Sequence, residues 1–311
     1  MTVDAIVSDI ELPSNGAPES QHSLAAGSTT HNSFSLTGKT IAITGGGRGL
    51  GITLALAVVE AGGNVACLDI LSEPSAYEWT SLLALAKKTG RSVTYHRCDV
   101  TDETSIETVM DAVARDATAR QAPFWGTIAC AGIQQQVPAL DYPAADFDRI
   151  LRVNVTGVFN TAKYAARVLR REGRPGSIVL ISSMSGNVAN RGLSCSAYNS
   201  SKAAVQQMCR SVAQEWGQYG IRVNTLSPGV SFPSVCLMAP ALTSQYIRTA
   251  MTDQLLQENP DVERTWMAGA LLGRLGAPED FKAPAVFLLS EGAAFVHGSD
   301  LRVDGGHCAS A

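Results

Sequence analysis

The chain has 311 residues, of which 45% are hydrophobic and 17% charged, and its 28 glycines suit a folded protein with many tight turns rather than a disordered one. Its formal net charge is −4 and its basic residues are scattered, so the sequence shows no cluster of positive charge that would bind nucleic acid or an anionic membrane. It also lacks the run of about 18 apolar residues that a transmembrane helix needs, and we therefore expect a cytoplasmic protein with small-molecule partners.

The first 35 residues contain no Lys or Arg. They match neither the basic start of a secretory signal nor an Arg-rich transit peptide. We predict a disordered leader over residues 1–35, followed by one dinucleotide-binding catalytic domain over residues 36–311. The seven cysteines are odd in number, widely spaced and without a C-x-x-C pair, so we interpret them as reduced packing residues. No metal site is predicted.

From Lys39 onward, short apolar runs alternate with stretches of helical periodicity. The expected strands cover residues 40–44, 65–68, 92–98, 127–130, 177–181, 221–226 and 301–303. The expected helices cover residues 50–61, 77–88, 102–119, 144–171 and 197–218. Repeated strand-helix units require a parallel sheet with helices on both faces. The predicted fold class is therefore α/β, a Rossmann-like doubly wound parallel sheet in a single domain, with ligands beyond the carboxyl ends of the strands.

A glycine-rich loop, TGGGRGLG, occupies residues 44–51 between the first strand and the first helix. Glycines here allow the backbone to approach a pyrophosphate, which rests on the amides and the positive dipole end of the following helix. A glycine cluster also occurs in ordinary turns, so its context decides its meaning. The candidate cofactor contacts in this loop are Gly45, Arg48, Gly49, Leu50 and Gly51.

Asp69 ends the second expected strand, at the spacing where an acidic side chain binds the ribose hydroxyls of adenosine. A carboxylate there repels a 2′-phosphate, since unit charges about 4 Å apart at an effective dielectric near 20 interact by roughly 4 kcal/mol. No Lys or Arg lies between residues 70 and 85 to offset this repulsion. NAD is therefore favoured over NADP, although Arg48 is able to reach a phosphate. Asp99 is placed to meet the adenine amino group, and Ala131 and Gly132 to form a floor under the cofactor.

Tyr198 and Lys202 are four residues apart on an expected helix, so they share one face. A phenol has a pKa of about 10 and is a poor base at neutral pH, but a nearby ammonium stabilises the phenolate. In isolation, such a pair is also found on any exposed helix. Other motifs must therefore decide whether it is catalytic.

Further motifs accompany this pair in a fixed order. They include VNVTG around Asn154, ISS at residues 181–183, YNSSK at 198–202, SPG at 227–229 and VDGG at 303–306. Together with the glycine-rich loop, they resemble the short-chain dehydrogenase/reductase family over about residues 34–306. The sequence around Tyr198 is most similar to that of fungal polyol or ketose reductases and of reductases of secondary metabolism.

The resemblance implies a role for four residues. Tyr198 is expected to be the general acid or base, and Lys202 to bind the nicotinamide ribose and to lower the tyrosine pKa. Asn154 is expected to bend its helix and support a proton-relay water. Ser183 is expected to hydrogen-bond the substrate oxygen. The implied reaction moves a hydride between nicotinamide and a carbonyl or secondary alcohol.

The resemblance leaves some assignments open. Ser182 and Ser185 are alternatives to Ser183. A catalytically silent dinucleotide-binding regulator is the alternative function. The family commonly pairs the helices that here span about residues 155–171 and 199–218, which implies a homodimer or homotetramer. The implied cofactor contacts also include Val100, Asn154, Tyr198, Lys202 and Val230.

The sequence departs from the family pattern in two places. Ala129 and Cys130 replace the two asparagines that usually precede Ala-Gly after the fourth strand. Residues 230–245 separate Pro-Gly at 228–229 from a stretch at 246–251 that resembles its usual continuation into a substrate lid, about 246–275. The DNA that encodes this segment begins with GT, because its first residue is Val, and is able to end in AG, because CAG encodes its last residue, Gln. We consider it either a translated, unspliced intron or a genuine insertion before the lid, and sequencing the transcript distinguishes them.

Overall fold

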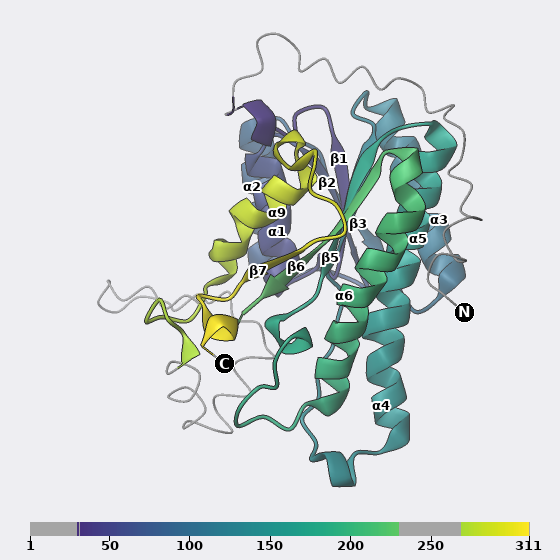
Figure 1. Ribbon diagram of the computed structural model, residues 1–311. Helices are drawn as coiled ribbons and strands as arrows, with labels where there is room; N and C mark the ends of the chain where they lie inside the picture. The colour runs from purple at the N-terminus through teal and green to yellow at the C-terminus, as the bar shows by residue number, and fades with distance from the viewer. Residues whose placement is uncertain (1–29, 31, 230–268, 311) are drawn as a thin grey trace, which may run out of the picture.

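Seven parallel strands form one sheet in the computed structural model, which describes residue 30 and residues 32–229 and 269–310 (Figure 1). Their order is β3-β2-β1-β4-β5-β6-β7. The chain therefore moves outward from β1 in one direction and then returns to continue from β4 in the other, which opens a crevice at the carboxyl ends of these two strands. The strands are β1 (Thr40–Thr44), β2 (Asn64–Asp69), β3 (Val93–Arg97), β4 (Phe124–Ala129), β5 (Gly176–Ile181), β6 (Ile221–Pro228) and β7 (Asp300–Val303).

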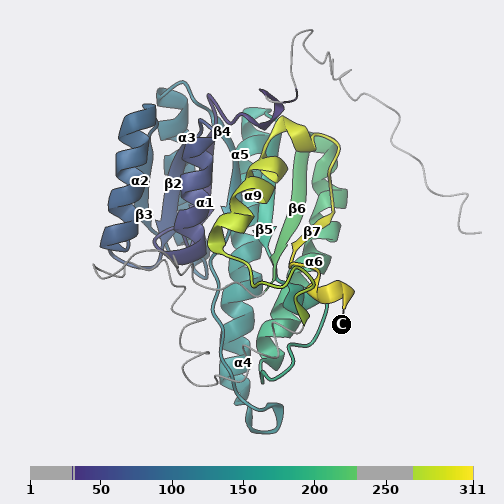
Figure 2. The same cartoon turned by 90° about the vertical axis from the view of Figure 1, so that its left-hand side faces the viewer.

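Helices cover both faces of this sheet, as Figure 2 shows. One face packs against α1 (Gly49–Glu60), α2 (Ala76–Thr89) and α9 (Lys282–Leu289). The other packs against α3 (Glu103–Ala119), α5 (Val158–Glu172) and α6 (Ser196–Trp216). Each face has its own buried apolar cluster, and burial of such surface is the main favourable contribution to folding. The predicted doubly wound α/β fold is confirmed.

The stretch where helices were expected, residues 144–171, consists of α4 (Ala144–Leu151), a π-helical turn (Arg152–Gly157) and α5. The turn contains Asn154, whose side chain is fully buried and bonded to groups outside its own helix. Such π-turns are frequent at functional sites. Apolar periodicity did not reveal this one, because it spans the interruption.

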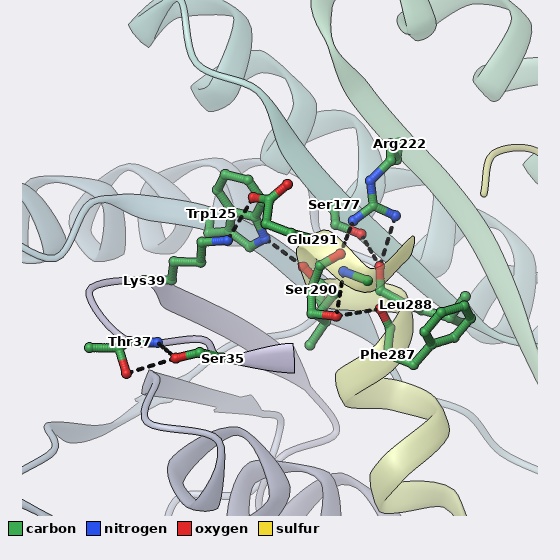
Figure 3. A network of polar contacts seen from close by, with 12 residues as sticks. Ser35, Thr37, Lys39, Trp125, Ser177, Arg222, Phe287, Leu288, Ser290 and Glu291 are labelled. Atoms are coloured by element: carbon green, nitrogen blue, oxygen red, sulfur yellow. Dashed lines mark hydrogen bonds and ion pairs between the residues drawn. The ribbon is translucent and has the colours of Figure 1, made fainter. Parts of the chain in front are cut away.

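Helix α9 was missing from the sequence prediction. Pro284 lies in its first turn, where the absence of an N–H costs little, but a proline in a short apolar run obscures a helical pattern. Its carboxyl end is held by side chains from the sheet (Figure 3). The Arg222 guanidinium donates hydrogen bonds to the Leu288 carbonyl at 2.9 Å and to the Ser290 carbonyl at 3.0 Å. Ser177 Oγ donates a further bond to Leu288 at 2.8 Å.

Lys39, which directly precedes β1, lies at the same end of the sheet as the carboxyl end of α9. Its ammonium lies 3.5 Å from the centroid of the Trp125 ring and 2.9 Å from a carboxylate oxygen of Glu291 (Figure 3). Near it, residues Asn32–Phe34 form a turn of 3-10 helix, and the Phe34 ring lies 6.2 Å from the ring of Phe287. The last residues of the predicted leader therefore contact the domain. The predicted insertion at 230–245, the lid through residue 268 and Val230 lie outside the described residues.

Candidate active site

A cavity of about 790 Å³ lies at the carboxyl ends of the strands. Its size is that of sites that enclose a cofactor and a small substrate. The loops that follow β1 through β6 all contribute to its wall, which explains why residues distant in sequence meet there. The predicted site residues that line it are Gly45, Arg48, Gly49, Leu50, Gly51, Asp69, Asp99, Val100, Ala131, Gly132, Ser183, Tyr198 and Lys202.

The glycine-rich loop forms one end of the cavity and fits a pyrophosphate. Gly45 has a φ of +67°, and a Cβ at this position would lie 2.9 Å from the main chain of Ala131. Gly132, on the floor, leaves more room, since a Cβ there would lie 3.4 Å from Asn154 Oδ1. Close backbone approach at the start of α1 is what a dinucleotide phosphate requires. These residues therefore fit a dinucleotide.

Carboxylates surround this end of the cavity. Asp69, at the end of β2, accepts hydrogen bonds from the Gly47 amide at 2.9 Å and from the Leu71 amide at 3.2 Å. Asp99, after β3, accepts bonds from the amide and the hydroxyl of Thr101, both at 2.8 Å. Arg48 is exposed at the rim of the cavity. Both predicted acidic contacts thus line the cavity, in orientations fixed by the main chain.

Tyr198 and Lys202 lie together in the first two turns of α6. The Lys202 ammonium is 5.4 Å from the centroid of the Tyr198 ring and donates a hydrogen bond to the Ile181 carbonyl at 3.0 Å. Lys202 is buried, whereas Tyr198 is partly open to the cavity. The bond to Ile181 ties the lysine to the end of β5, so the two side chains have a fixed relation to the loop that carries the serines.

Among the three serines, Ser183 has the geometry expected of a substrate contact. It forms a side-chain hydrogen bond with Tyr198, and its hydroxyl is 3.1 Å from Ser185 Oγ. Ser182 Oγ instead donates to the main-chain carbonyl of Lys202 at 2.9 Å. That bond engages the Ser182 hydroxyl with the backbone of α6. The geometry therefore favours Ser183 over Ser182.

Asn154 lies behind the cavity wall, since its side chain is fully buried and outside the lining. Its amide accepts a bond from the Ile133 amide and donates one to the Ile133 carbonyl, both at 2.8 Å. It also donates to Ser201 Oγ at 3.0 Å, and Ser201 Oγ donates to the Tyr198 carbonyl at 2.6 Å. Asn154 therefore connects the loop after β4 to the helix that carries Tyr198.

Burial controls the protonation of the central pair. It raises the pKa of the Tyr198 phenol to about 12, and the hydrogen bond with Ser183 acts in the opposite direction. It lowers the pKa of the Lys202 ammonium to about 8. The pKa of Tyr198 is therefore raised, not lowered as expected from its lysine neighbour, because desolvation dominates in the chain without a cofactor. At neutral pH the phenol keeps its proton and is a donor.

Several residues of the site have no motif and were missed. Asn190 donates to Ser185 Oγ at 2.8 Å, and Gln134 and Leu193 line the cavity beside it. Glu78 reaches the glycine-rich loop from α2. Only the tertiary packing brings these side chains to the cavity, so no local pattern in the sequence predicts them.

Comparison with known protein families gives two matches. The family model described as short chain dehydrogenase matches residues 39–234, and the model described as enoyl-(acyl carrier protein) reductase matches residues 239–307. The first match alone covers more than half of the chain.

Curated relatives and solved structures agree with these matches. A short chain dehydrogenase/reductase of Aspergillus versicolor is 42% identical over 279 residues, which cover 88% of this chain and 89% of that protein. An NADH-dependent L-xylulose reductase of Ambrosiozyma monospora is 31% identical over 280 residues, with 88% and 96% covered. The crystal structure of an NADPH-dependent 3-quinuclidinone reductase of Rhodotorula rubra superposes with a TM-score of 0.76 at 33% identity, covering 94% of this chain and 99% of that one.

Proposed function

The chain belongs to the short-chain dehydrogenase/reductase family and is an NAD(P)-dependent oxidoreductase, and we propose that it interconverts a polyol and its ketose with NAD as the preferred cofactor. The observation that carries the substrate class is a row of polar groups beside the reacting centre. Ser185 Oγ is 3.1 Å from Ser183 Oγ, and the Asn190 amide is 2.8 Å from Ser185 Oγ. These groups suit a substrate with a second hydroxyl next to its carbonyl. The L-xylulose reductase among the relatives supports the same class.

The chain's own residues account for the proton and the orientation of the substrate. The nicotinamide, when bound, supplies or accepts the hydride. In reduction, the Tyr198 hydroxyl donates its proton to the substrate oxygen while Ser183 hydrogen-bonds that oxygen. Lys202 contributes a positive charge near the oxygen as it becomes alkoxide-like. Asn154 acts as a positioning residue for Tyr198 through Ser201. Oxidation of an alcohol requires the reverse proton transfer, to a Tyr198 phenolate.

The proposed preference for NAD rests on Asp69. Both of its carboxylate oxygens accept main-chain amides, at 2.9 and 3.2 Å, so the charge is fixed where a ribose 2′-phosphate would approach. Arg48 opposes this preference, because its exposed guanidinium is able to pair with the same phosphate. The proposed preference therefore requires that the effect of Asp69 exceed that of Arg48.

The proposal includes a cytoplasmic homodimer or homotetramer assembled through α5 and α6. Phe159, in α5, is 38% exposed, as expected for an apolar residue that a second copy covers. The six described cysteines are free thiols, which is usual in a reducing compartment. In the described part of the chain, no helix is long and apolar enough to cross a membrane.

Turnover by the wild type and the Tyr198→Phe variant tests the proposal. Both proteins are assayed with NADH and NADPH on a panel of ketoses, apolar ketones and the corresponding alcohols. We expect activity on ketoses with NADH, and loss of nearly all turnover in Tyr198→Phe with NADH binding retained. Substantial activity of Tyr198→Phe would refute the chemistry. Activity confined to apolar ketones, as in a reductase of secondary metabolism, would refute the substrate class.

A further inference from the structure

Glu78 is a buried carboxylate that reaches the cofactor cavity from a neighbouring helix. It lies in the first turn of α2, its side chain is 7% exposed, and it contributes to the lining of the cavity. Its Oε1 accepts a hydrogen bond from the Gly49 amide at 3.0 Å. Gly49 is the first residue of α1, and the side chain of Arg48, at the N-cap position, makes no capping bond. Glu78 therefore supplies, from another helix, the acceptor that the start of α1 lacks.

Two carboxylates hold the glycine-rich loop in this way. Asp69 accepts from the amide of Gly47, and Glu78 accepts from the amide of Gly49, so the amides on both sides of Arg48 are bonded to acidic side chains. The described lining of the cavity has an excess of negative charge. Its acidic residues are Asp69, Glu73, Glu78 and Asp99, and its basic residues are Arg48 and Lys202.

A fixed carboxylate changes what the start of α1 attracts. The amino end of a helix carries a positive partial charge and free amides, which is why it attracts phosphate. Glu78 occupies one of these amides and offsets part of the charge. Its burial limits screening by solvent and salt, so its field extends into the cavity with little attenuation. Any phosphate binds less tightly as a result, and a cofactor with an additional 2′-phosphate, of charge about −2, is penalised most.

We propose that Glu78 is a specificity-determining residue that discriminates against NADP(H), together with Asp69. This inference rests on the proposed preference for NAD and extends it to a second residue, which comes from α2 rather than from the end of β2. It also explains how Arg48, a guanidinium in the glycine-rich loop, is compatible with a preference for NAD. Arg48 lies in the chain between Gly47 and Gly49, whose amides hold these two negative charges beside the loop.

Glu78→Gln separates charge from structure, because the amide oxygen of glutamine still accepts the bond from Gly49. The matched control is Glu73→Gln, which removes one negative charge from the same cavity at an exposed residue. Dissociation constants of NADH and NADPH are measured for the full-length wild type and both variants by nicotinamide fluorescence. Titrations at low and high salt, with thermal unfolding of the free proteins, complete the set.

We expect the Kd of NADPH to fall about 10-fold in Glu78→Gln and that of NADH about 3-fold, from the loss of one fixed charge near the phosphates. In Glu73→Gln, both should change by less than about 2-fold, because solvent screens an exposed charge. The Glu78→Gln effect should change little between low and high salt, because burial limits the screening of this charge, and the unfolding temperature of the free protein should stay close to that of the wild type.

An unchanged ratio of the two dissociation constants in Glu78→Gln would overturn the inference. So would an equal change in Glu73→Gln, which would assign the effect to net charge alone. A large fall in unfolding temperature with an unchanged ratio would assign Glu78 a purely structural role. The ratio of the two dissociation constants in the wild type tests the proposed NAD preference separately. A wild type that prefers NADPH would refute that preference, and the effect of Glu78→Gln on the ratio would still be measured.

Discussion

Asn154→Ala should cost more stability than the loss of one hydrogen bond, because the wild-type side chain takes part in three. The wild-type side chain makes three hydrogen bonds, at 2.8, 2.8 and 3.0 Å, and is fully buried. Each contributes about 1 kcal/mol net, and the two main-chain groups of Ile133 lose a side-chain partner, which adds to the cost. We expect a loss of about 3 kcal/mol, or about 6 to 12 °C in unfolding temperature for a domain of this size. The value of kcat should also fall, since Ser201 and Tyr198 lose their support.

Urea unfolding followed by circular dichroism measures this loss. Asn160→Ala is the matched control, because Asn160 is also a buried asparagine on the same helical segment but donates one bond, to the Val100 carbonyl at 3.1 Å. It should lose about 1 kcal/mol. Equal losses in the two variants would refute the reasoning that Asn154 joins the loop after β4 to α6. Unchanged kcat in Asn154→Ala would refute its positioning role.

Two further predictions concern the charged residues of the core. The folded pKa of Lys202 is about 8, below its usual 10.5. Between pH 8 and pH 10.5, the unfolded chain therefore still binds a proton that the folded chain has released. In urea unfolding, the free energy of unfolding of the wild type should rise by up to about 3 kcal/mol relative to that of Lys202→Met as the pH goes from 8 to 10.5. A difference that stays constant with pH would contradict the lowered pKa. Arg222→Met should cost about 2 kcal/mol and Arg222→Lys less, because Arg222 bonds two carbonyls at the end of α9. No loss in either variant would show that this cap contributes nothing.

Local patterns in the sequence predicted most of the architecture. Alternating apolar runs identified all seven strands, with β4 starting at Phe124, three residues earlier than expected. The glycine-rich loop and the spacing of Tyr198 and Lys202 were also predicted, because each depends on neighbours within one or two turns of chain. Asp69 was predicted from its place at the end of the second strand. These features locate the cavity, since a parallel sheet brings the loops after its strands to one edge.

Long-range packing decided the rest. The sequence already favoured Ser183 over Ser182, but the bond of the Ser182 hydroxyl to the backbone of α6, 20 residues away in sequence, is visible only in the folded chain. Asn154 lies in a π-turn whose bonds run to Ile133 and Ser201, so its role behind the wall is invisible in the helical pattern. Glu78 contacts Gly49 across 29 residues. Sequence determines which elements form, because propensity and periodicity are local, whereas the direction and pKa of a side chain depend on what the folded chain packs around it.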